Sequence, residues 1–176
     1  ANALTSYAAY LSKPFTDAAF EYTKVLTGQA VQKARSEEMT QAVDRSLGHG
    51  LAQLYVKKYF PEDARKRMMV LVGNLKKAFE ARINRLDWMS DSTKAKAREK
   101  LAAFSEKIGY PDKWRDYSLV EVKRDSYFEN RLSANRNDYQ YSTSKLGKPV
   151  DRTEWLTTPP TVTAYNNPPL NEIVFP

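Results

Sequence analysis

The stretch MMVLVGNLKKAFEARINRL, Met68–Leu86, decides the fold class. Its large apolar residues recur every three or four positions, as they do on one side of an α-helix: Met68, Leu71, Val72, Leu75, Phe79, Ile83 and Leu86. The lysines and arginines among them fall largely outside this stripe. Glu62 and Asp63 come just before it, where acids favour the positive end of a helix dipole. We therefore predict a long amphipathic helix that follows Pro61 and reaches Leu86.

Two further helical patterns precede this stretch. A short helix is expected over residues 17–26, and Gly28 interrupts it. A longer helix is expected over residues 31–58, because its apolar residues have the same spacing of three and four. Pro61 ends that helix, since proline disfavours helical geometry in the residue before it.

A third amphipathic pattern follows the opening stretch. Ser90-Asp91-Ser92 offers an N-cap, and the apolar residues that come after it predict a helix that runs through Ile108 and ends at Gly109. Three amphipathic helices with short connections favour antiparallel neighbours in a bundle. The first two thirds of the chain are therefore expected to be helical.

The amino-acid composition changes from Tyr110 on, where aromatic residues mix with prolines and polar residues. One more helix is expected over residues 125–145, and Leu146-Gly147-Lys148-Pro149 should form a turn. We predict a boundary near Gly147. Residues 1–147 would form a helical lobe, and residues 148–176 an extended crossover into a second lobe.

The end of the chain predicts a β-hairpin. Thr161–Tyr165 alternates and is rich in β-branched and aromatic residues, Asn166-Asn167-Pro168-Pro169 is typical of a turn, and Asn171–Phe175 resembles a second strand. Two strands alone are marginal in water, so the hairpin needs a sheet or a helix to lie on. The expected fold class is mainly α: a helical bundle-like lobe with a C-terminal extended segment and a β-hairpin.

Composition narrows the range of functions. The net charge of +7 and pI near 9.5 suit a nucleic-acid binder, but the basic residues are spread out and mixed with acids, so we expect solvated helix faces and no nucleic acid. The aromatic residues after Tyr110 could stack bases, although core packing fits their apolar neighbours better. No apolar run approaches the length of a membrane span. The chain has no cysteine, which excludes disulfides.

Many segments resemble, in the same order, the neprilysin and endothelin-converting-enzyme family of zinc metallopeptidases. They are Leu11–Phe15 (LSKPF), Gly50–Val56 (GLAQLYV), Tyr59–Pro61 (YFP), Leu86–Met89 (LDWM), Lys107–Trp114 (KIGYPDKW), Pro149–Trp155 (PVDRTEW), Val162–Tyr165 (VTAY) and Asn171–Pro176 (NEIVFP). The resemblance covers nearly the whole chain. It implies a longer parent protein, a zinc metalloendopeptidase that hydrolyses oligopeptides, of which this chain precedes the zinc-binding helix.

In that family, two histidines of an HExxH helix and a glutamate from a later helix hold the zinc. This sequence has one histidine, His49, which we expect to be an interior or helix-surface residue. The resemblance therefore implies zinc in the parent enzyme and none bound by this chain, which alone would be inactive. Its partners would be peptide substrates and the missing catalytic lobe. Since animal members are disulfide-bonded ectodomains, a cysteine-free chain resembles a bacterial member, periplasmic or secreted.

The resemblance also implies a substrate-binding segment. The family's asparagine-alanine pair, which contacts substrate, aligns with Thr163-Ala164, and Tyr165 follows it. Threonine lacks the paired donor and acceptor of an amide, so one substrate hydrogen bond is in doubt, whereas the backbone at Ala164 is unaffected. Without the resemblance, a plain structural strand is the simpler interpretation. The alternative function is a stand-alone, non-catalytic helical module that binds a protein or a peptide.

Overall fold

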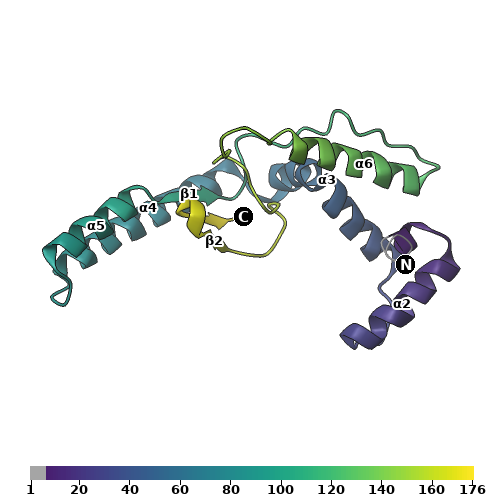
Figure 1. Ribbon diagram of the computed structural model, residues 1–176, viewed down its shortest axis with the longest axis horizontal. Helices are drawn as coiled ribbons and strands as arrows, with labels where there is room; N and C mark the ends of the chain where they lie inside the picture. The colour runs from purple at the N-terminus through teal and green to yellow at the C-terminus, as the bar shows by residue number, and fades with distance from the viewer. Residues whose placement is uncertain (1–6) are drawn as a thin grey trace. The chain divides into compact units, whose positions relative to one another are not determined.

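Five α-helices and a small sheet make up the structure, a computed structural model that describes residues 7–176, and the chain is mainly α as predicted (Figure 1). The chain forms two compact units, each with most of its contacts within itself. Unit 1 contains the described residues up to Gly48 together with Asp116–Pro149. Unit 2 contains His49–Arg115 together with Val150–Pro176. The predicted lobe boundary near Gly147 concerns a longer protein and stays a prediction, and residues 1–6 of the predicted helical lobe lie outside the described residues.

Unit 1 contains helices α2 (Lys13–Thr27) and α6 (Tyr127–Thr143) and the first part of α3 (Arg35–Tyr59). Gly28 ends α2 in the left-handed conformation, with φ of 72°, as the sequence predicts. α3 has a kink at Leu47, next to the boundary between the two units.

Polar side chains hold α6 to the loop before it. The Asn130 side chain donates to the Lys123 carbonyl and accepts from the Lys123 N–H, both at 2.7 Å. Ser133 Oγ accepts from the Glu121 N–H at 2.9 Å. These hydrogen bonds fix the loop before α6 to the helix without apolar contacts.

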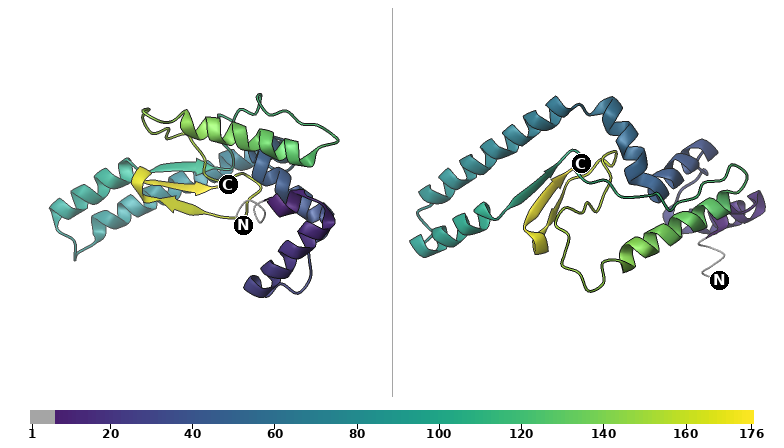
Figure 2. Two further views of the ribbon diagram at one scale, coloured as in Figure 1. Left: turned by 45° about the vertical axis from the view of Figure 1, so that its right-hand side comes forward. Right: turned by 90° about the horizontal axis from the view of Figure 1, so that it is seen from above.

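Unit 2 contains a helix pair, α4 (Glu62–Arg85) and α5 (Asp91–Ala102), which lie side by side in the views of Figure 2. Ser90 caps α5, because its Oγ accepts from the Thr93 N–H at 3.2 Å. Val72 and Ile83 of the predicted α4 stripe are buried. The antiparallel arrangement predicted for neighbouring helices is confirmed for this pair.

A three-stranded sheet lies beside the helix pair. Its strands are β1 (Ser105–Ile108), β2 (Tyr165–Asn167) and β3 (Glu172–Phe175), in the order β1-β3-β2. β1 is parallel to β3, with Ser105 opposite Glu172, and β2 is antiparallel to β3, with Tyr165 opposite Val174. The upstream strand β1 thus supplies the sheet that the C-terminal hairpin needs.

The expected helix through Ile108 is wrong over its last turns. α5 ends at Ala102, and Ser105–Ile108 is strand β1. The spacing of Leu101, Phe104 and Ile108 fits a helix, but pairing with β3 competes with it. The Ser105 N–H donates to the Asn171 carbonyl at 3.1 Å, and the Gly109 N–H to the Phe175 carbonyl at 2.7 Å.

The hairpin is confirmed, but its first strand begins later than expected. The Thr161 N–H donates to the Thr158 carbonyl at 2.9 Å in a turn, and pairing with β3 starts only at Tyr165. Asn166 and Asn167, expected in the turn, pair with β3 instead. The turn itself is a 3-10 segment, η2 (Pro168–Leu170), followed by Asn171 in the left-handed conformation.

None of the helices in the described range 7–176 is both long enough and apolar enough to cross a membrane.

Candidate functional site

The predicted site residues lie at and just before an edge strand. β2 is at the end of the strand order, so only one of its sides pairs with β3. Tyr165 is the first paired residue, and Thr163 and Ala164 precede it with exposed side chains. The residues just before β2 are therefore exposed, and β2 itself has one side that is not paired with a strand of the sheet, which is what strand addition by a peptide requires.

Tyr165 is anchored to this unit through its side chain. Its hydroxyl accepts a hydrogen bond from the Leu156 N–H at 3.3 Å. Partial burial raises the pKa of Tyr165 above its ordinary value, and the charge of Glu172 raises it further, so the phenol stays protonated at neutral pH. The side chain of Tyr165 is therefore used within unit 2, where it fixes the start of β2.

A buried polar cluster around Glu172 ties the three strands together. The Glu172 side chain is only 2% exposed, and its Oε2 lies 2.8 Å from Lys107 Nζ of β1. Its Oε1 accepts from the Asn167 amide of β2 at 3.1 Å. Lys107 Nζ also donates to the Glu154 carbonyl at 2.7 Å, and the Asn166 amide donates to the Glu172 carbonyl at 2.9 Å. The position of β2 is therefore set by directional hydrogen bonds.

Sequence reasoning missed this cluster. Alternation along Asn171–Phe175 does place Glu172 on the same face as Val174, and both are buried. That signal is weak, because a glutamate in a strand usually faces water. Lys107 was expected in a helix, so nothing indicated that it lies beside Glu172.

The one histidine does not provide a metal site. His49 is half-buried on α3, and its ring lies 6.0 Å from that of Trp114 in an edge-on contact. Burial lowers the pKa of His49, and the charge of Arg115 lowers it further. Within residues 7–176, no group of three histidine, cysteine or acidic residues could hold a metal ion. The residues that the structure describes therefore do not fit a zinc ion.

Aromatic residues near His49 are used in packing. Tyr110 stacks on Trp114 with ring centroids 6.2 Å apart, and the Arg65 guanidinium lies 4.4 Å from the Tyr110 ring. Phe60 meets Tyr110 edge-on, and Trp155 is buried. These rings form intramolecular contacts, as the core-packing interpretation predicts.

Comparison with known proteins shows which family this chain matches. The family model described as Peptidase family M13 matches residues 1–111. The chain is 32% identical to an endothelin-converting enzyme homolog of Locusta migratoria over 97% of its own length and 24% of the relative's. It is 33% identical to a neutral endopeptidase of Lactobacillus helveticus, over 98% of this chain and 27% of that protein.

Solved structures agree with the sequence comparisons. The zinc metalloprotease Zmp1 of Mycobacterium tuberculosis, solved with an inhibitor, superposes with a TM-score of 0.88 and 38% identity, over 98% of this chain and 26% of that one. PepO of Lactobacillus rhamnosis superposes with a TM-score of 0.85 and 28% identity, over 99% and 28%. The chain spans about a quarter of the length of these relatives. On the match to the family model and these likenesses, the chain belongs to Peptidase family M13.

Proposed function

We propose that this chain is part of a zinc metalloendopeptidase that hydrolyses oligopeptides, and that its own contribution is a strand that aligns the peptide. The observation that supports this proposal most directly is that the exposed residues Thr163 and Ala164 lead into the edge strand β2 at Tyr165, in a chain of family M13. The peptide would lie alongside this segment as an added strand. Main-chain hydrogen bonds would hold it and make little demand on its sequence.

The polar cluster supports this role. An edge that aligns a substrate must keep its position, because small displacements of a reacting bond are costly to the rate. Asn167 of β2 is held to Glu172, and Glu172 is held to Lys107 of β1. The cluster would therefore fix the position of β2 when a peptide binds.

The helices would have a different task. In the proposed parent enzyme they form part of the wall of the substrate chamber and limit the size of the peptides that enter. The zinc ligands would come from parts of the parent protein outside these residues, since the described residues do not fit the metal.

The test compares the parent protein with the 176-residue chain. Zinc content is measured by atomic emission, and hydrolysis is followed with an internally quenched fluorogenic oligopeptide. The parent should contain about one zinc per molecule and lose its activity to a chelator, whereas the chain alone should show neither property. A parent without zinc and without hydrolysis would refute the peptidase proposal. Peptide binding by the chain alone would then favour the non-catalytic module.

Thr163 gives a finer prediction in the parent enzyme. Thr163→Asn should lower KM by about twofold to tenfold, because the amide adds one hydrogen bond to the peptide and such a bond contributes about 0.5–1.5 kcal/mol. The matched control is Val162→Asn, since Val162 is its fully exposed neighbour. Initial-rate kinetics with one peptide would give KM for both variants. An unchanged KM in Thr163→Asn, or an equal fall in the control, would contradict the role of this side chain.

A further inference from the structure

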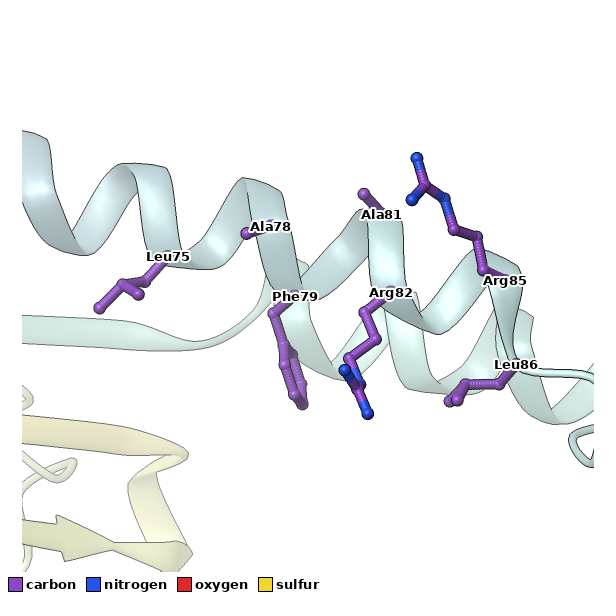
Figure 3. Close-up of a pocket in the computed structure, with 7 residues that line it drawn as sticks. All are labelled: Leu75, Ala78, Phe79, Ala81, Arg82, Arg85 and Leu86. Carbon is purple, nitrogen blue, oxygen red and sulfur yellow. The ribbon is translucent and has the colours of Figure 1, made fainter.

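An apolar groove runs between α4, α5 and the sheet, all within unit 2. Its volume is about 770 Å³. Leu75 and Phe79 of α4, Leu101 of α5 and Ile173 and Phe175 of β3 line it. Figure 3 shows part of the α4 side at close range: Leu75, Phe79, Arg82 and Leu86 project from one side of the helix, whereas Ala81 and Arg85 project from the other.

The groove exposes residues that normally belong to a core. Leu75 is 60% exposed, Phe79 58% and Trp88 74%. Leu75 and Phe79 belong to the same α4 stripe as Val72 and Ile83, which are buried. A contiguous apolar surface of this kind marks an interaction site.

Charge indicates what kind of partner fits. Every ionisable residue that lines the groove is basic: Lys76, Arg82 and Lys100. Lys76 is already paired, 2.9 Å from Glu106. A partner should therefore carry apolar residues toward Phe79 and acidic residues toward Arg82 and Lys100. A second copy of this chain fits poorly, because face-to-face docking would bring these basic residues close to each other.

We propose that the groove binds an amphipathic helix of the parent polypeptide, from outside residues 1–176, whose apolar face is flanked by acidic residues. This proposal rests on the proposed function, in which the chain is part of a longer enzyme. The relatives match over nearly all of this chain but have about four times its length, so a family member has ample further chain to fill the groove. An intramolecular partner also benefits from a high effective concentration. Helices that dock in this way present anchors at i, i+3 or i+4, and i+7.

Cysteine accessibility tests the proposal, because this chain has no cysteine of its own. Phe79→Cys places a thiol in the groove. Val70→Cys is the matched control, since Val70 is on the same helix, is 65% exposed and does not line the groove. Its position, nine residues before Phe79, is about half a turn from it around α4. Both variants are made in the 176-residue chain and in the parent, and labelling with a maleimide is read by peptide mass spectrometry.

The expected result is protection of one position only. In the 176-residue chain both thiols should react quickly. In the parent, Phe79→Cys should react at least about tenfold more slowly, as expected of a buried position that reacts only on opening, and Val70→Cys should be unchanged. Rapid labelling of Phe79→Cys in the parent would overturn the proposal, and so would equal protection of both positions. Protection in the isolated chain that grows with concentration would also overturn it, in favour of a second copy.

A measurement without any substitution guards against misfolded variants. Hydroxyl-radical footprinting should show that Trp88, in the groove, reacts less in the parent than in the 176-residue chain. Met69, on α4 outside the groove and 52% exposed, should react equally in both. Equal reactivity of Trp88 in the two proteins would overturn the proposal.

The outcomes for groove and function are separable. A protected groove in a parent without zinc would refute the peptidase and leave the docking helix in place. An active, zinc-containing parent with an unprotected groove would support the peptidase and refute the docking helix.

Discussion

Replacing Lys107 by methionine is expected to lower the free energy of unfolding of unit 2 by about 3–5 kcal/mol, because the substitution leaves the Glu172 carboxylate buried without its counter-charge. Methionine keeps most of the length of the lysine side chain, so little volume is lost. The Lys107 side chain is 11% exposed and that of Glu172 2%, so water cannot replace the lost contact. The Glu154 carbonyl also loses its donor.

Urea unfolding followed by tryptophan fluorescence is the measurement, since Trp88, Trp114 and Trp155 all lie in unit 2. The control is Lys66→Met, which breaks the ion pair between Lys66 and Glu62. That pair has a similar distance, 2.9 Å, but both side chains are exposed. The control should leave the unfolding midpoint unchanged, because exposed pairs contribute little.

A double variant separates the buried charge from the loss of packing. In Lys107→Met combined with Glu172→Leu, no charge remains in the cluster, and most of the lost stability should return, since apolar replacements of buried ion pairs are often neutral. If Lys107→Met were as harmless as Lys66→Met, the cluster would not hold the sheet together. A double variant no more stable than Lys107→Met would instead indicate that the hydrogen bonds to Asn167 and Glu154 matter more than the charge.

The helices could be predicted from the sequence because their determinants are local. The apolar spacing, the acids after Pro61 and the cap at Ser90 place α4 and α5 within a few residues of their starts. β1 could not be predicted in this way. Its partner β3 begins at Glu172, more than sixty residues along the chain. The spacing of apolar residues in Leu101–Ile108 fits a helix, so the local sequence does not indicate that this segment pairs with β3 instead.

The candidate site also has a part that the sequence predicts and a part that depends on distant segments of the chain. The choice of Thr163–Tyr165 follows from the family resemblance, and the structure places these residues at and just before the start of the edge strand β2. The cluster of Glu172, Lys107 and Asn167 depends on three strands meeting, so no local pattern reveals it. The Met68–Leu86 stripe predicted α4 correctly, but a stripe alone does not say that Leu75 and Phe79 are left exposed, because that depends on what else is present to cover them.

The second large effect is expected for Gly109→Ala, which should destabilise unit 2 by about 2–5 kcal/mol. Gly109 has φ of +75°, in the left-handed region, where a side chain costs about 1–2 kcal/mol. A Cβ there would also collide with the Phe60 ring, and overpacking of this kind adds about 1–3 kcal/mol. Moving the backbone away is costly too, because the Gly109 N–H donates to the Phe175 carbonyl at the end of β3.

Two controls separate backbone strain from collision. Gly28→Ala has a similar φ of +72° but open space around the new methyl group, so unfolding followed by circular dichroism should show only the backbone cost of about 1–2 kcal/mol. In a Phe60→Ala background the collision partner is absent, and Gly109→Ala should then cost no more than Gly28→Ala. An undiminished cost in that background would mean that strain alone explains the effect. The small cost expected there would instead show that Phe60, just after α3, and Gly109, just after β1, are coupled by contact, which links the helix to the three-stranded sheet.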